Sequence, residues 1–333
     1  MVLAINGGNP IRTTPFPTHI TVGKEEKARI SEVIDSGCLS QYLGCWHDQF
    51  YGGTQVKALE QEWAQYFGAK HAIAVNSATS GLYCAVAATG VEPEEEIIVS
   101  PYTMCASATA PLIFNAIPVF ADVEADYFCL DPQSIEACIT QKTRAIIVVD
   151  LFGLPYSDEI NRIAKKHNLM VIEDCAQSPG ATLNGVSAGL LGDMGVFSLN
   201  YHKHIHCGEG GVIVTDDDVL AEKCRLVRNH AEAVVEGKGV TDLVNMIGFN
   251  FRMTEIEAAI ARCQLEKLPS LNAKRFENVR YIEQGLSQFP FITSPKVRDG
   301  AEHAYYLHAC KFDEDKAGIS RDVFIDAVKA ELP

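Results

Sequence analysis

Short apolar runs that recur between residues 71 and 215 constrain the fold most strongly. They are rich in β-branched residues, and several are apolar at consecutive positions, which is typical of strands covered on both faces. Amphipathic stretches lie between them, around 56–67, 157–167 and 217–228. This alternation predicts an α/β fold with a mostly parallel, buried sheet between helices. The runs cover 71–75, 96–100, 117–123, 145–152, 169–174, 195–199 and 211–215.

The pattern changes in the last quarter of the chain. From Thr254 to Phe289 the spacing of apolar residues predicts one long helical stretch. Pro269 is expected to kink or break it, because proline removes a backbone donor and clashes with the preceding turn. Only short strand-like pieces follow, notably at 304–312, before a last helical segment at 320–332.

The length of the chain limits the number of domains. At ~150 residues per domain, a chain of 333 residues has room for about two domains. We predict a large domain over 1–249, with an N-terminal segment at 1–22, and a smaller C-terminal domain over 250–333. No internal repeat or low-complexity run in the sequence indicates a solenoid.

Charge and cysteine usage exclude several classes of partner. The chain has 28 basic and 43 acidic residues, and its formal charge of −15 repels phosphate backbones and anionic lipids. We therefore expect no nucleic-acid or membrane partner. The 11 cysteines include no C-x-x-C pair, which argues against a zinc module or a disulfide scaffold and predicts a reducing compartment, the cytoplasm. No uncharged apolar run reaches the ~18 residues that a membrane span needs, so we expect a chain that is neither exported nor anchored.

Small hydroxyl residues meet a helix start after the strand predicted at 71–75. The sequence N-S-A-T-S follows, so the backbone N–H groups of Ala78 and Thr79 fall at a helix N-terminus. Free N–H groups and the Thr79 hydroxyl at such a place can cradle a phosphate. An ordinary helix cap favours the same residue types, so this pattern alone does not distinguish a helix cap from a phosphate site.

An acidic residue ends the apolar strand predicted at 169–174. Asp174 lies at the carboxyl end of this strand, where open α/β sheets bind ligands, and Gln177 follows three residues later. A buried carboxylate needs a partner, and a protonated heterocyclic nitrogen would keep both groups charged. A helix cap or a structural ion pair is the alternative.

A lysine follows the strand predicted at 195–199. Lys203 stands five residues after Ser198 and before a Gly-Glu-Gly-Gly turn at 208–211. Among apolar groups and histidines, such an amine can have a depressed pKa and attack a carbonyl carbon. A surface loop with a solvated lysine is the alternative. Histidines flank Lys203 at alternate positions, but no carboxylate or cysteine completes a recognised zinc spacing, so we expect no metal site.

A polar pair precedes the long helical stretch. Asn250 and Arg252 stand shortly before Thr254, and Glu257 follows three residues after that threonine. The spacing of Thr254 and Glu257 predicts a capping box. Asn250 is not part of this capping box, so its side chain can contact an anion at the domain junction.

In order and spacing, these four features resemble the sugar aminotransferases of the DegT/DnrJ/EryC1/StrS family, which are pyridoxal 5'-phosphate enzymes of fold type I. The resemblance rests on a strand ending in E-D-x-A-Q, on F-S with a lysine five residues after the serine, on G-E-G-G and on N-x-R-M-T. It extends over nearly the whole chain, from I-N-G-G-N-P-I-R onward. It implies a fold type I transferase, with a large sheet domain and a smaller C-terminal α/β domain.

The resemblance also implies roles for the reactive residues. Lys203 matches the lysine that binds the cofactor aldehyde covalently and moves the proton. Asp174 matches the aspartate that keeps the pyridine nitrogen protonated, so that the ring accepts electrons. Gln177 matches a residue that bonds the phenolic oxygen of the ring.

Further positions match the cofactor-binding residues of the family. Ala78 and Thr79 match the phosphate-binding turn, and Ser198 supplies another hydroxyl to the same phosphate. Asn250 matches a residue that reaches the phosphate from the neighbouring subunit, which implies a homodimer with a shared active site. Met104 stands where many relatives have an aromatic residue, and its thioether is expected to cover the cofactor ring.

The reaction implied by the resemblance is transamination from glutamate or glutamine to a keto sugar, commonly nucleotide-linked, or to a cyclitol. The alternatives are a sugar dehydratase with the same cofactor and a non-catalytic regulatory or binding protein on the same fold. A nucleotide-sugar dehydrogenase is disfavoured, because no G-x-G-x-x-G turn follows an early strand. Relatives usually continue for several tens of residues past the match to K-A-E-L-P, so we expect a truncated small domain.

Overall fold

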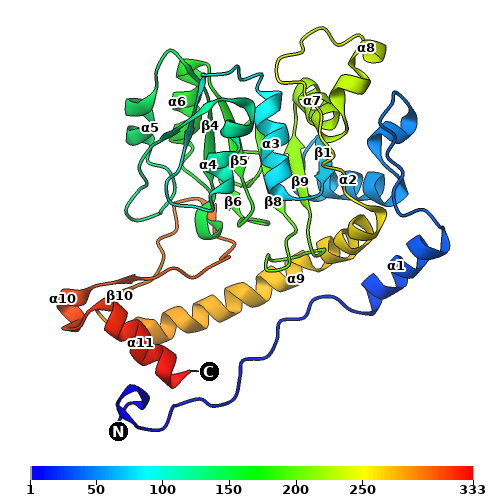
Figure 1. The fold of residues 1–333 in the computed structure, drawn as a ribbon. Coiled ribbons are helices and arrows are strands. Elements are labelled where there is room, and N and C mark those ends of the chain that lie inside the picture. The colour runs from blue at the N-terminus through cyan, green and yellow to red at the C-terminus, as the bar shows by residue number, and fades with distance from the viewer. Residues whose placement is uncertain (1, 333) are drawn as a thin grey trace. The chain divides into compact units, whose positions relative to one another are not determined.

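Within residues 2–332, which the computed structural model describes, a seven-stranded sheet forms the centre of the fold (Figure 1). Its strands are β1 (His71–Val75), β2 (Glu96–Val99), β3 (Ile117–Phe120), β4 (Thr143–Val149), β5 (Met170–Asp174), β8 (Met194–Ser198) and β9 (Gly211–Thr215). Their order is β1-β9-β8-β5-β4-β2-β3, and only β9 runs antiparallel to its neighbours in this described sheet. The predicted α/β fold with a mostly parallel sheet is confirmed, and every predicted run overlaps one of these strands.

Helices cover both faces of the sheet, as the apolar runs require. They include α2 (Thr54–Phe67), α3 (Ala78–Ala88), α6 (Glu159–His167), α7 (Asp218–Arg228) and α9 (Glu255–Leu286). Ile73 and Val75 of β1 belong to the apolar cluster that contains α3 and α7, whereas Ala72 and Ala74 belong to the cluster around Trp63 of α2. Successive strand residues therefore enter two different cores. The predicted amphipathic helices are confirmed as α2, which precedes β1, and as α6 and α7.

The remaining elements are short, apart from two helices. The α-helices are α1 (Lys24–Asp35), α4 (Ala106–Thr109), α5 (Pro132–Cys138), α8 (Val235–Lys238), α10 (Glu314–Ala317) and α11 (Arg321–Glu331). The 3-10 turns are η1 (Ala4–Asn6), η2 (Asp48–Tyr51), η3 (Pro111–Phe114), η4 (Leu151–Gly153) and η5 (Ala231–Ala233). The short strands are β6 (Thr182–Leu183), β7 (Val186–Ser187), β10 (Ile292–Thr293), β11 (Ala301–Glu302) and β12 (Lys311–Phe312). Within the described part of the chain, no helix is long and apolar enough to cross a membrane.

Two details of the C-terminal third differ from the sequence prediction. A break at Pro269 is wrong, because α9 continues through this residue while Leu265 and Leu268 stay buried in the apolar cluster beneath it. A strand over 304–312 is also wrong for most of its length, since only β12 at its end is a strand. The backbone of Ala304 instead donates to the carbonyl of Gly153, so this segment bonds to η4 and not to a neighbouring strand.

Contacts within the chain define two compact units. The larger contains Val22–Phe276 and Lys296–Leu307, and the smaller contains Met1–Thr21, Glu277–Pro295 and His308–Pro333. In the smaller unit, the rings of Phe291, Phe312 and Phe324 pack together, and the Glu331 carboxylate accepts the N–H groups of Ala4 and Ile11. These units group the residues differently from the division at residue 250, which stays a prediction about domain organisation.

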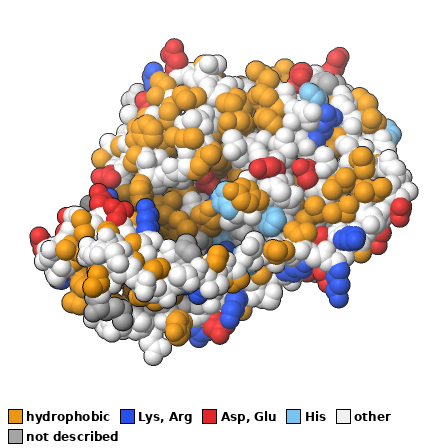
Figure 2. All heavy atoms as spheres, turned by 60° about the horizontal axis from the view of Figure 1, so that its bottom comes forward, with side chains coloured by type: hydrophobic (Ala, Val, Ile, Leu, Met, Phe, Trp, Pro, Cys, Tyr) orange, Lys and Arg blue, Asp and Glu red, His pale blue; other side chains and the backbone are white. Residues whose placement is uncertain are grey.

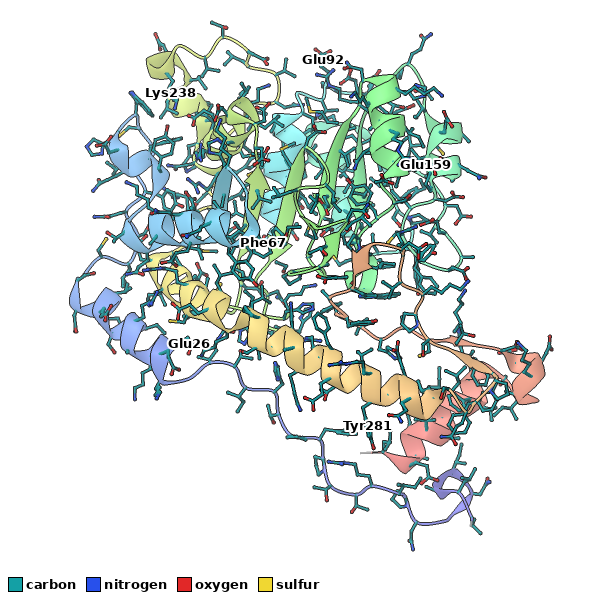
Figure 3. All side chains as sticks on the ribbon, turned by 180° about the vertical axis from the view of Figure 1, so that it is seen from behind. Glu26, Phe67, Glu92, Glu159, Lys238 and Tyr281 are labelled. Carbon is teal, nitrogen blue, oxygen red and sulfur yellow. The ribbon has the colours of Figure 1, made fainter. Side chains whose placement is uncertain are left out.

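A buried ion pair ties α1 to α9 in the larger unit, where the two helices lie side by side (Figures 1 and 3). Glu26 is fully buried and accepts from Lys267 Nζ at 2.6 Å and from Gln264 Nε2 at 2.8 Å. Its other oxygen accepts the N–H of Gly23 at 2.7 Å. Burial raises the pKa of the Glu26 carboxyl, but these hydrogen bonds outweigh burial and lower that pKa to about 2.

We expect Glu26→Gln to destabilise the protein at neutral pH by about 1.5–3 kcal/mol, the usual value of a hydrogen bond to a charged group. Because the folded-state pKa is depressed, this stabilisation is fully present above the unfolded pKa and disappears as pH falls through about 2. Urea unfolding of both proteins between pH 7 and pH 3 measures the difference in unfolding free energy. That difference should shrink toward low pH, and a constant difference would contradict the role of the charge.

Candidate active site

A cavity of about 180 Å³ lies at the carboxyl ends of the parallel strands in the larger unit. Its walls come from the start of α3, the segment before α4, the end of β5 and the loop after β8. The structure brings together there all but one of the predicted site residues, although these lie far apart in the sequence. The predicted residues that line the cavity are Ala78, Thr79, Met104, Asp174, Gln177, Ser198 and Lys203.

Asp174 ends β5 with its carboxylate buried. One carboxylate oxygen accepts the Ser107 hydroxyl at 2.7 Å, and the other accepts the Ala176 N–H at 3.1 Å. Burial raises the pKa of this carboxyl, while the two hydrogen bonds and the charge of Lys203 oppose the rise. A cationic group in the cavity would stabilise the charged form of Asp174. Ser107 was missed by the sequence analysis, because nothing in C-A-S-A-T-A marks it and its partner is 67 positions away.

Gln177 is held by the backbone of the neighbouring turn η4. Its Oε1 accepts the Phe152 N–H at 2.7 Å, which leaves the amide Nε2 as the donor of this side chain. Phe152 has a positive φ of 61°, so the turn that presents this N–H is conformationally unusual. The arrangement favours an acceptor, such as an oxyanion, next to Gln177.

Two buried carboxyl groups connect the loops behind Gln177. Asp150 accepts the Ser178 hydroxyl at 2.8 Å and the Tyr156 N–H at 3.0 Å. Burial raises the pKa of Asp150 well above its usual value, and the neighbouring carboxyl of Glu173 raises it further. These bonds join the loop after β4 to the loop after β5, and they fix the segment that carries Gln177.

Lys203 projects into the cavity from the loop after β8. Burial lowers the pKa of its amine, whereas the negative charge of Asp174 opposes that change. The Lys203 Nζ lies 4.4 Å from the centroid of the Tyr306 ring, a contact that the sequence analysis did not foresee. His202 also lines the cavity, but His204 is buried elsewhere, and its Nε2 lies 2.9 Å from the carbonyl oxygen of Ala304.

The start of α3 forms the opposite wall. Ser77 caps the helix, because its hydroxyl accepts the Ser80 N–H at 3.0 Å. The earlier N–H groups, on Ala78 and Thr79, have no acceptor one turn back within the helix, and both residues line the cavity. Gly211 permits this geometry, since a Cβ there would lie 2.6 Å from the Ala78 nitrogen. The ordinary cap and the anion site predicted for this region are therefore compatible.

Two predicted site residues, Met104 and Asn250, are less enclosed than the others. Met104 lines the cavity but is 64% exposed, and its sulfur accepts the Ala106 N–H at 3.2 Å. Asn250 does not line the cavity within this described chain; its side-chain oxygen accepts Arg252 Nε at 2.7 Å. The predicted capping box is confirmed, with Glu257 accepting the Thr254 N–H at 2.8 Å and Thr254 accepting the Glu257 N–H at 3.3 Å.

A partly buried lysine beside a buried aspartate, at the carboxyl ends of a mostly parallel sheet and opposite a helix N-terminus, defines the fold type I class of transferases. The chain belongs to the DegT/DnrJ/EryC1/StrS aminotransferase family, whose model matches residues 23–332. It is therefore an aminotransferase.

Individual relatives support this assignment. The chain is 33% identical over 317 residues to the spore coat polysaccharide biosynthesis protein SpsC of Bacillus subtilis, covering 93% of this chain and 79% of SpsC. The aminotransferase from Psychrobacter cryohalolentis is 32% identical with a TM-score of 0.82, over 94% of this chain and 81% of that one. The structure of DesI, determined with its TDP-sugar product, gives 28% identity and a TM-score of 0.84 over 99% of this chain and 80% of DesI.

Proposed function

We propose that the chain uses pyridoxal 5'-phosphate to move an amino group from glutamate or glutamine to a keto sugar, commonly nucleotide-linked, or to a cyclitol. The observation that carries this proposal is the pairing of Lys203 with the buried carboxylate of Asp174 in one cavity. The sugar acceptor is supported by the relatives, since DesI was solved with a TDP-sugar product and SpsC belongs to polysaccharide biosynthesis.

The polar groups of the cavity fit the cofactor. Asp174 would hold the ring nitrogen protonated, and the Gln177 amide would donate to the phenolic oxygen. The first turn of α3 and the Ser198 hydroxyl would bind the phosphate. Met104 would lie against the ring face. When bound, the cofactor supplies an electron sink for the carbanion formed at the reacting carbon.

Lys203 would perform the covalent and proton-transfer chemistry. It would be the residue that holds the cofactor covalently, since burial favours the neutral form of its Nζ. In the first half-reaction this Nζ would take up the proton from the α-carbon of the amino donor and hold it. In the second it would return a proton to the carbon of the keto acceptor.

An assay of both products distinguishes transamination from dehydration. With glutamate and a panel of nucleotide-linked keto sugars, an aminotransferase forms 2-oxoglutarate and an aminated sugar in equal amounts. A dehydratase would release ammonia and leave no amino group on the sugar. Free ammonia without an aminated product would overturn the proposed reaction.

We further propose a homodimer in which Asn250 completes the site of the partner subunit. A groove of about 480 Å³ is lined by Val235, Leu243, Met246 and Ile247. Apolar side chains are also exposed on the face of the molecule that Figure 2 shows. Leu243 and Ile247 are among the exposed large apolar residues, which is typical of an interaction surface. Asn250 is exposed, and burial in a dimer would bring its amide toward a neighbouring site.

Mixed dimers test this sharing. We expect Asn250→Ala to weaken cofactor binding about tenfold, through loss of one hydrogen bond to a charged group. Refolding Lys203→Ala together with Asn250→Ala should restore about one quarter of the wild-type activity at limiting cofactor, because half of the dimers then contain one intact site. The matched control mixes the double variant with wild-type chain: its heterodimers contain no intact site, so it keeps only about the one quarter of activity that its wild-type homodimers supply. No gain in the first mixture, together with about half of the wild-type activity in the control, would place Asn250 in the site of its own subunit.

The cytoplasm is the proposed location. All 11 cysteines are free thiols in the structure, several of them buried in the core, as expected for a protein of a reducing compartment.

A further inference from the structure

A short segment from the C-terminal part of the sequence returns to the active site. This strap, Lys296–Leu307, belongs to the larger unit. The Ala304 N–H donates to the Gly153 carbonyl at 2.8 Å, and the Leu307 N–H donates to the Phe152 carbonyl at 3.3 Å. The strap is therefore attached to η4, the same turn that holds Gln177.

The close approach of the strap requires a glycine in η4. Gly153 has a φ of 103°, and a Cβ there would lie 2.9 Å from the Tyr305 nitrogen and 3.0 Å from the Tyr306 nitrogen. These are backbone atoms, so they could not yield as a flexible side chain does. The strap and the turn fit together only with glycine at this position.

The residue that follows Lys203 anchors the strap from the other side. His204 is fully buried, and burial lowers its pKa to about 3, so the ring is neutral. Its Nε2 therefore carries the proton that is donated to the Ala304 carbonyl at 2.9 Å. Arg275 of α9 also donates to the strap, at the Tyr305 carbonyl over 3.2 Å. These hydrogen bonds fix the position of the strap relative to the loop that carries Lys203.

Tyr306 extends from this anchored strap to the Lys203 amine. The Nζ lies 4.4 Å from the ring centroid, within the range of a cation–π contact. Lys203 is partly buried, and such contacts strengthen when the cation is desolvated. The ring stabilises the ammonium form against the amine form. The titratable and charged groups around this contact are Asp174 from β5, Tyr201, His202, His204 and Glu209 from the loop after β8, and Arg275 from α9.

We propose that Tyr306 is a positioning residue, whose ring receives the Lys203 ammonium whenever the amine is free of the cofactor. This inference rests on the proposed function. In each half-reaction Nζ must take a proton from carbon and hold it until delivery. The Tyr306 ring holds Nζ in the cavity during that interval and favours the protonated form, while Asp174 supplies the opposite charge at longer range.

Titration of Lys203 in the cofactor-free protein tests the contact directly. Competitive labelling with an amine-reactive anhydride, read by peptide mass, gives the fraction of Lys203 that is neutral at each pH. Loss of the ring removes a stabiliser of the ammonium, so Tyr306→Leu should lower the midpoint by about half a unit to one unit. Tyr306→Phe keeps the π face and should keep the wild-type midpoint. Amino transfer should fall about five- to thirtyfold in Tyr306→Leu and be retained in Tyr306→Phe.

Matched variants separate this role from simple packing. Tyr201→Leu removes an exposed aromatic ring from the loop of Lys203 and should leave the midpoint unchanged. Tyr306→Met, a second variant without a π face, should reproduce the shift if Tyr306→Leu does not fold. An unshifted midpoint in a folded Leu or Met variant overturns the proposal. Because the labelling needs neither cofactor nor donor, its result is independent of whether the proposed reaction occurs.

Discussion

Lys203→Ala is expected to lose amino transfer by about four orders of magnitude or more, as happens when a covalent nucleophile is removed. The side chain supplies both the covalent attachment and the carrier of the proton, so its removal takes away both functions at once. His204 is buried, neutral and committed to the Ala304 carbonyl, so it is not a substitute base. Single-turnover kinetics with glutamate measure the first half-reaction without any choice of acceptor.

The fold of this variant should persist. Among the described residues Lys203 has no ion-pair partner within 4.0 Å, and its removal relieves the burial of an amine. Lys142→Ala, at an exposed lysine, is the matched control and should retain full activity. Normal turnover in Lys203→Ala would remove the central assignment of the site.

Asp174→Asn is expected to slow both half-reactions by about 10²–10³-fold, the usual effect of removing one preorganised electrostatic contact. Asparagine matches the shape of aspartate: its Oδ1 can still accept the Ala176 N–H, and its Nδ2 can donate to the Ser107 hydroxyl. It cannot provide the negative charge that keeps a ring nitrogen protonated, so the electron sink weakens. Rates of the separate half-reactions, measured by stopped-flow absorbance, report this loss.

Ser107→Ala separates the charge of Asp174 from its orientation. This change removes the 2.7 Å hydrogen bond and leaves the carboxylate in place. We expect a smaller loss than in Asp174→Asn, since the Ala176 N–H still orients the other oxygen. An unaffected rate in Asp174→Asn would mean that this carboxylate is structural.

Local sequence pattern was sufficient to predict the sheet and most of the cavity. Strands covered on both faces leave consecutive apolar residues, and β5 places Asp174 at its carboxyl end. The residues that sequence reasoning missed depend on contacts between distant segments. Tyr306 contacts Lys203 although 103 positions separate the two residues in the sequence. The strap that carries Tyr306 has no strand or helix periodicity, because its backbone bonds to η4. Pro269 does not end the helix as one of its two predicted effects would require, since the packing of α9 outweighs one lost backbone bond.

Covalent trapping of the cofactor tests the central claim most directly. The purified chain is incubated with pyridoxal 5'-phosphate, its visible spectrum is recorded with and without glutamate, and a sample is reduced with borohydride for peptide mass mapping. The account predicts a single adduct on Lys203 and a visible band that glutamate bleaches. An adduct on another lysine, or no adduct on a folded chain, would contradict it.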